Sequence, residues 1–174
     1  MNIGMDVGRD LHEYLLAHDL VDLRLPECPD VEQKWDETAM AYLPDGIREF
    51  NEFPTASLGW MMFVGMAIAH MWDVDWQHYG GCSDLYQQLR DARGYDSLDD
   101  HVMEDVLQLD EQARGKLSGI VAECAGRALS ALSHCQAEPG SQKAFKAYVA
   151  CLKQLYLMGM AMELKRLGYR MCKL

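Results

Sequence analysis

Residues 55–76 would be apolar on every side if they formed a helix. The large apolar side chains of this segment are Trp60, Met61, Met62, Phe63, Val64, Met66, Ile68, Met71 and Trp72. A helix without a polar face is stable only when other elements surround it. The most apolar part, residues 58–72, is about 15 residues long, whereas a membrane span needs about 20. The sequence therefore predicts a core helix, with Trp60, Phe63 and Met66 almost wholly buried.

The rest of the chain also has helical spacing. Apolar residues recur every three or four positions, and no stretch alternates strictly as a β-strand does. The chain has 174 residues, of which 49% are apolar and 25% charged, as in one globular domain. We therefore expect a single all-α domain, residues 1–174, with six to seven helices around the central apolar helix. The expected helices are 6–19, 30–42, 45–51, 55–76, 83–94, 98–136 and 141–167.

Two interruptions of these helices are expected. Pro44 should end the helix that begins near Asp30, because proline lacks an amide N–H. Apolar positions keep one helical phase from residue 98 to residue 136. An unbroken helix of that length would be about 58 Å long, whereas a domain of this size has a radius of gyration of about 16 Å. We therefore expect a break near Asp110 to Gly115.

Charge is divided unevenly along the chain, whose net charge is −11. Residues 1–111 hold 24 acidic and 6 basic side chains, whereas residues 112–174 hold 3 acidic and 10 basic ones. The overall charge argues against nucleic-acid and membrane partners, which attract clustered Lys and Arg. The division predicts that the two parts attract each other, within one subunit or between copies, with Lys146 and Lys153 on a basic face of the last helix.

The six cysteines form no CxxC pair and no metal-ligand spacing; they are Cys28, Cys82, Cys124, Cys135, Cys151 and Cys172. Residues 1–5 lack the features of a secretory segment. We therefore expect reduced thiols and a cytoplasmic location. Cys124 and Cys135 share one face of the same expected helix, where buried small apolar side chains are favoured over a redox pair.

Four side chains near the end of the apolar segment could bind a metal ion: His70, Asp73, Asp75 and His78. His70 and Asp73 are three residues apart and share a helix face, as two ligands from one helix must, and we expect them to interact. Asp36 could join them if its helix runs antiparallel to this one. Imidazole ligands favour zinc or a similar transition metal over magnesium. The alternative is structural, since the helix dipole favours a histidine at this end.

Glu49 and Glu52 form an ExxE pair that stands 17 residues before His70 and Asp73. At these four positions the chain resembles the all-α nucleoside triphosphate pyrophosphohydrolases, whose paired carboxylates hold magnesium. The resemblance implies a magnesium site between the two pairs. If Pro54 opens the apolar helix, however, Glu52 and His70 lie about 22 Å apart, too far to share one ion.

Methionine is unusually frequent, with 12 in the chain. Four of them, Met61, Met62, Met66 and Met71, lie on one expected helix, and three, Met158, Met160 and Met162, lie on another. Methionine fills irregular gaps in cores and also lines grooves for apolar ligands. Both uses stay open, and glycines on the same two helices would allow a close approach between them.

Glu163 falls on the apolar side of the last expected helix, where a carboxylate needs a partner. Either the helix end reaches solvent or an arginine pairs with it, or Glu163 is a buried acid of a functional site with a raised pKa.

No nucleophile motif, glycine-rich phosphate loop or HExxH motif occurs in the sequence. The leading hypothesis is therefore a non-catalytic cytoplasmic protein that acts through protein–protein contacts and forms a homo-oligomer. The first alternative is a metal- or small-ligand-binding protein, or a metal-dependent enzyme, with its site around His70, Asp73, Asp75 and His78. The second is a carrier of an apolar ligand on the Met-rich helices. No cofactor is indicated beyond a zinc-like ion in the first alternative.

Overall fold

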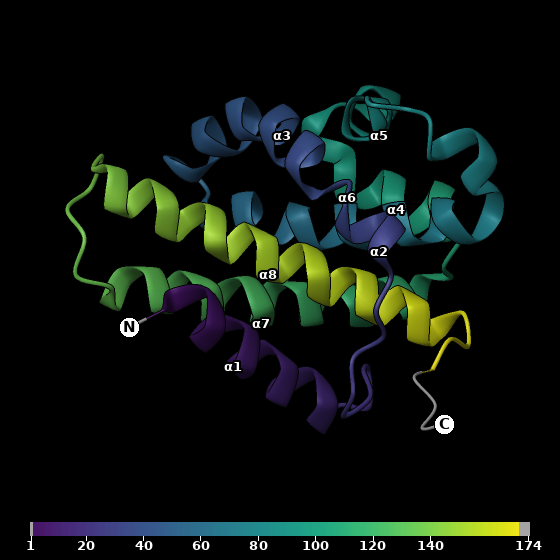
Figure 1. Ribbon diagram of the computed structural model, residues 1–174, viewed down its shortest axis with the longest axis horizontal. Coiled ribbons are helices and arrows are strands. Elements are labelled where there is room, and N and C mark those ends of the chain that lie inside the picture. Colours follow the sequence, from purple (N-terminus) through teal and green to yellow (C-terminus); the bar gives the residue numbers. More distant parts are fainter. Residues whose placement is uncertain (1, 171–174) are drawn as a thin grey trace.

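The computed structural model describes residues 2–170, which fold into helices without β-strands (Figure 1). The prediction of a single all-α domain is confirmed. The eight α-helices of the described chain, of which α2 and α6 are single turns, are α1 (Ile3–Ala17), α2 (Pro29–Glu32), α3 (Trp35–Phe50), α4 (Pro54–Tyr79), α5 (Leu85–Arg93), α6 (Leu98–Asp100), α7 (Glu111–His134) and α8 (Gln142–Arg166). A 3-10 turn, η1 (Tyr95–Ser97), precedes α6, and a π-helical turn, η2 (His101–Val106), follows it.

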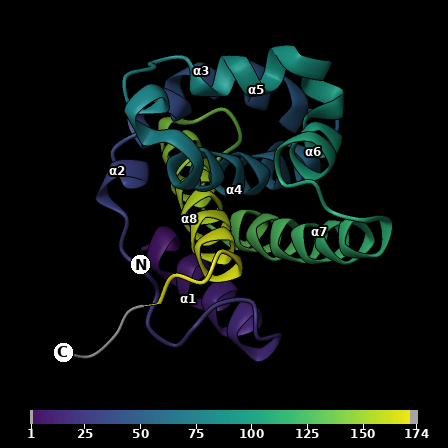
Figure 2. The same ribbon diagram turned by 90° about the vertical axis from the view of Figure 1, so that its right-hand side faces the viewer.

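α4 packs against α3, α7 and α8, and α8 in turn lies between α4 and α1 (Figure 2). Every residue of α4 from Ser57 to Ala69 is buried except Trp60, so α4 has no polar face along this length. Phe63 and Met66 are 2% and 3% exposed. The expectation that Trp60 is almost wholly buried is wrong. Its ring is partly exposed, and its indole N–H donates to the carbonyl oxygen of Tyr95 at 2.8 Å, at the edge of the core.

The backbones of α4 and α8 touch where the two helices cross. A β-carbon added at Gly65 would overlap the carbonyl oxygen of Tyr156, and one added at Gly159 would overlap that of Met62. Glycine is therefore required at both positions for this close approach. Six methionines of these two helices are buried in the core: Met61, Met62 and Met66 of α4, and Met158, Met160 and Met162 of α8.

Of the two expected helix interruptions, one is absent and the other lies slightly earlier in the chain. The interruption at Pro44 is absent, because α3 continues through Pro44 to Phe50. Pro44 removes only one hydrogen bond, that to the carbonyl of Met40, and both residues are exposed, so water can satisfy that carbonyl. The predicted break in residues 98–136 does occur, slightly earlier, at residues 107–110. Gln108 has a positive φ of 53° there, and the side chain of Asp110 accepts the N–H of Ala113 at 2.8 Å as the N-cap of α7.

A further break lies inside α4, at Asp75, whose backbone is extended. The carboxylate of Asp75 accepts the backbone N–H of His78 at 3.3 Å, so Asp75 caps a last separate turn.

Within residues 2–170, no helix combines the length and the apolar character that a membrane span requires.

Ion pairs join the acidic and basic parts of the chain. Asp10 lies 2.9 Å from Arg127, and Asp19 lies 2.9 Å from Lys165. These two pairs connect the acidic and basic parts within one subunit. The expected basic face of α8 does not take part, because Lys146 and Lys153 are exposed and have no acidic partner within 4 Å in the described chain; Lys173 and Cys172 lie outside the described residues.

Candidate functional site

The four side chains proposed as metal ligands have separate partners. His70 bonds to Glu163 on α8, whereas Asp73 accepts the hydroxyl of Tyr169 at 2.6 Å. Asp75 caps the last turn of α4, as described above. His78 packs its ring edge-on against Tyr79. No hydrogen bond or ion pair joins His70 to Asp73 in the described chain, because one side chain turns toward α8 and the other toward the residues that follow α8.

Among residues 2–170, no three His, Cys, Asp or Glu side chains are grouped so that they could hold a metal ion. Asp36 is exposed on α3, and no hydrogen bond or ion pair joins it to His70 in the described chain.

His70 is held by a buried carboxylate. Glu163 is 0% exposed, and its Oε2 accepts the Nδ1–H of His70 at 2.8 Å. Arg166 donates from Nη2 to the same oxygen at 2.8 Å and from Nε to the other carboxylate oxygen. These hydrogen bonds raise the pKa of the Arg166 guanidinium. The apolar-side position of Glu163 is thus explained by two partners, an arginine one turn away and a histidine on another helix.

His101 is held in the same way by a different element. Its Nδ1 donates to Oδ2 of Asp105 at 2.8 Å, and that carboxylate oxygen also lies 3.7 Å from Arg93. Both members of the pair belong to η2. They stand four residues apart, so they lie about one helical turn apart on the same side of η2. Sequence reasoning missed His101, although a histidine four residues before an aspartate in an expected helix was a usable signal.

His70 and His101 line one pocket of about 410 Å³, which we call the histidine pocket. Its wall is formed by α4, α5 and η2, which pack against one another. Besides the two histidines, its polar side chains are Tyr79, Gln88 and Asp105, and its other side chains are Met71, Val74, Leu89, Ala92 and Val106. The pocket therefore has one largely apolar surface and a small number of polar groups.

The Nε2 atoms of both histidines are accessible. Neither atom has a hydrogen-bond partner in the described chain. In that part of the chain, Oε1 of Gln87 is the one buried side-chain nitrogen or oxygen without a partner, so both Nε2 atoms are at least partly exposed. Because Nδ1 of each ring donates to a carboxylate, the neutral ring carries its lone pair on Nε2. Each histidine that lines the pocket thus has one ring nitrogen fixed by a carboxylate and the other without a hydrogen-bond partner in the described chain.

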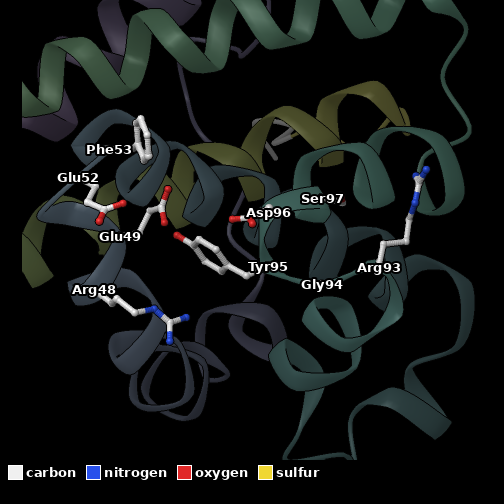
Figure 3. A pocket seen from close by; sticks show the side chains of 9 residues that line it. All are labelled: Arg48, Glu49, Glu52, Phe53, Arg93, Gly94, Tyr95, Asp96 and Ser97. Carbon is white, nitrogen blue, oxygen red and sulfur yellow. The ribbon is translucent and has the colours of Figure 1, made fainter.

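A second pocket, of about 630 Å³, lies where α3 ends beside η1; we call it the η1 pocket. Glu49 and Glu52 lie close to Tyr95 and Asp96, whereas the guanidinium of Arg93 points away from them (Figure 3). The pKa of Glu49 is raised by partial burial and by the negative charges of Asp96 and Glu52. The ExxE pair therefore faces the η1 pocket, whereas His70 faces the histidine pocket. The structure does not bring the four positions of the resemblance together.

Comparisons of this chain with known protein families, with curated proteins and with solved structures found no match. The proposals that follow therefore depend on the geometry of the chain itself.

Proposed function

We propose that this protein binds a small organic molecule in the histidine pocket. The observation that carries this proposal is the convergence of His70 and His101, from two different elements, on one cavity of about 410 Å³. Each ring has its Nδ1 fixed by a carboxylate and its Nε2 accessible. Pockets for small molecules have volumes of roughly 300–1,000 Å³ and combine apolar walls with a few oriented polar groups.

The polar groups indicate the chemistry of the ligand. A neutral imidazole with a protonated Nδ1 accepts a hydrogen bond at Nε2, so the ligand should present N–H or O–H groups to His70 and His101. The carboxylate of Asp105 is also an acceptor, and the hydroxyl of Tyr79 can donate or accept. Met71, Leu89 and the other apolar side chains of the wall favour a flat or apolar body between the polar ends.

Histidine NMR spectra recorded during titration with a library of small polar aromatic compounds test this proposal. Compounds that bind should shift the Cε1–H signals of His70 and His101 together. The variants His70→Asn and His101→Asn keep an amide donor near the position of Nδ1 and remove Nε2. We expect each to weaken binding about tenfold or more, as the loss of a ligand hydrogen bond does.

His134→Asn is the matched control. His134 is exposed, and its Nδ1 bonds to the backbone carbonyl oxygen of Ser130 at 2.7 Å, far from the pocket residues in sequence. Its replacement should leave binding unchanged. If no compound shifts the signals of His70 and His101, or if binding persists unchanged in both Asn variants, the proposal is wrong.

Self-association is a second candidate function, as the sequence predicted. We infer it from apolar side chains on the outer face of α3 and just after it. Met40 and Ile47 are two helical turns apart and are 77% and 43% exposed, and Phe53 is 60% exposed. A cytoplasmic location is proposed with it, because the five described cysteines are all free thiols, as in a reducing compartment.

A further inference from the structure

We infer that the histidine pocket is an active site for proton transfer, in which Nε2 of one histidine removes a proton from the bound molecule and the other histidine, protonated, stabilises the charge that develops. This inference rests on the proposed function, since it needs a molecule in the pocket. It goes further by assigning a reaction class, general acid–base catalysis, and by naming His70 and His101 as the catalytic residues.

Both imidazoles have the arrangement that such chemistry requires. A carboxylate at Nδ1 holds the ring in one orientation and stabilises the imidazolium that forms when Nε2 takes a proton. Glu163 does this for His70 at 2.8 Å, and Asp105 does it for His101 at 2.8 Å. His78, in contrast, has no carboxylate hydrogen-bonded to its ring in the described chain.

The surroundings of the two carboxylates differ. Glu163 is buried and shares its charge with Arg166, whose guanidinium bonds to both of its oxygens. Asp105 is half-exposed, and the guanidinium of Arg93 lies 3.7 Å from it. One pocket thus holds two imidazoles with unlike surroundings, as the separate roles of a base and an acid require.

The apolar wall supports the same chemistry. Leu89 and Val106 are buried or half-buried and, with Ala92, line the pocket beside His101. A bound molecule that covers this wall displaces water from the two Nε2 atoms, and electrostatic stabilisation is stronger when water is excluded. η2 supplies both His101 and Val106, so one π-helical turn provides a catalytic group and part of the apolar wall. Such turns occur frequently at functional sites.

The test uses 5-nitrobenzisoxazole, a flat apolar molecule whose ring opens when a base removes the hydrogen from its C3 carbon. The proton passes to Nε2, the C–H electron pair forms the nitrile, the N–O bond breaks, and the oxygen becomes a phenolate stabilised by the second imidazolium. The coloured product is measured directly. We expect the protein to exceed free imidazole at equal concentration. The value of kcat/KM should fall at low pH, where the base is protonated and has no lone pair, and also at high pH, where the second imidazolium has lost its proton.

His70→Asn and His101→Asn should each lower kcat/KM on the order of a hundredfold or more, as the loss of a general acid or base does. His134→Asn should leave the rate unchanged. The NMR signals of His134 in the two pocket variants, and their circular dichroism, show whether they are folded. If one variant fails to fold, the other variant and the pH dependence of the native protein still decide the result.

Two failures can be told apart. If 5-nitrobenzisoxazole shifts the signals of His70 and His101 but reacts no faster than with free imidazole, the acid–base inference is overturned and binding stands. A rate that survives both Asn variants also overturns it. If neither this probe nor any compound of the library shifts those signals, the proposed function itself fails.

Discussion

Glu163 joins the core of the molecule to the histidine pocket. It is fully buried among the core residues of α8, yet its carboxylate bonds to a side chain that lines the pocket. A buried carboxylate is tolerated only when partners compensate for its lost hydration, and His70 and Arg166 both do so. Loss of either partner therefore affects both the stability of the protein and the orientation of His70.

Phe63 should make one of the largest contributions to stability. Its ring is 2% exposed and packs edge-on against Trp60. We expect Phe63→Ala to lower the free energy of unfolding by about 3–5 kcal/mol, through lost burial and the cavity left behind. Phe53→Ala is the matched control and should change it by less than about 0.5 kcal/mol, because Phe53 is largely exposed. Urea denaturation measures both; a loss below about 1 kcal/mol at Phe63 would contradict close packing around α4.

Glu49 should make the stability of the protein depend on pH. Its pKa is raised above its ordinary value of 4.5 by burial, Asp96 and Glu52, so the folded state favours the neutral form. The stability that this supplies is fully present below pH 4.5 and is lost as pH rises through the raised pKa. Glu49→Gln should therefore melt at a higher temperature than the native protein at neutral pH, with the advantage shrinking as pH falls.

Glu27→Gln, at an exposed position of the segment between α1 and α2, is the control for that comparison. Thermal melts from acid to neutral pH measure all three proteins. An advantage of Glu49→Gln that is equal at every pH, or equal to that of Glu27→Gln, would contradict the electrostatic explanation.

The sequence indicated only part of the candidate site. His70 could be found because it stands near the end of an apolar segment, and Glu163 because it falls on an apolar face. Their contact could not, because 93 positions separate them and only the crossing of α4 and α8 brings them together. Asp73 was the closer candidate along the chain, but Tyr169 binds it instead. Spacing within one helix cannot show which neighbouring helix a side chain faces.

Two groups of helical glycines differ in their surroundings. Gly65 and Gly159 lie where α4 and α8 touch, and a β-carbon at either position would overlap backbone atoms. Gly115, Gly119 and Gly126 lie on the exposed side of α7, where an added β-carbon would meet nothing within 4 Å in the described chain. Packing between α4 and α8 therefore requires glycine at positions 65 and 159. No packing contact in the described chain requires glycine at the three positions of α7.

Gly126→Ala and Gly65→Ala should therefore have opposite effects on stability. Alanine in an exposed helix interior is more favourable than glycine by about 1 kcal/mol, so Gly126→Ala should raise the free energy of unfolding by that amount. Gly65→Ala should lower it by about 3 kcal/mol, because α4 and α8 must separate to admit the methyl group. Urea denaturation of the two variants measures both. A loss of stability in Gly126→Ala would show that this glycine makes a contact outside the described chain.

Helix boundaries were less predictable than the helices themselves. The long helical pattern of residues 98–136 correctly predicted two helical parts and a break, because one continuous helix of that length would not fit into a compact domain of this size. The π-helical form of η2 has no comparable signal in the apolar spacing. Pro44 was expected to end a helix, but an exposed proline loses only one hydrogen bond and α3 continues through it.

The molecule as a whole pairs its acidic amino-terminal part with its basic carboxy-terminal part. The contacts run between α1 and α7 through Asp10 and Arg127, and between the segment after α1 and α8 through Asp19, Asp22 and Lys165. Lys165 bonds to Asp19 and thereby lowers the pKa of that carboxyl group. Exposed pairs of this kind contribute only about 0.2–1 kcal/mol each, so they orient the helices more than they hold them together.

Self-association should weaken as salt is added. Lys146 and Lys153 remain exposed, and the acidic part of a second copy is their natural counterpart. If apolar side chains such as Met40 supply the affinity, these lysines should steer the encounter, and salt should screen them at Debye lengths below about 8 Å. Sedimentation at low and high salt measures this. Lys146→Gln with Lys153→Gln should reduce association at low salt, whereas Lys116→Gln on α7 should not.

A protein that sediments as a monomer at every ionic strength would contradict the homo-oligomer proposal. If an oligomer forms whose association depends neither on salt nor on the two lysine substitutions, apolar contacts alone hold it together and the proposed role of the lysines is wrong.

The crossing of α4 and α8 also bears on how the chain is synthesised. Arg166, the last residue of α8, follows Tyr79, the last of α4, by 87 positions. At roughly 5–20 residues per second, translation of that interval takes about 4–17 seconds. During this time α4, the most apolar helix of the protein, has no α8 to pack against. The nascent chain should therefore be a substrate for ribosome-associated chaperones until its last helix emerges.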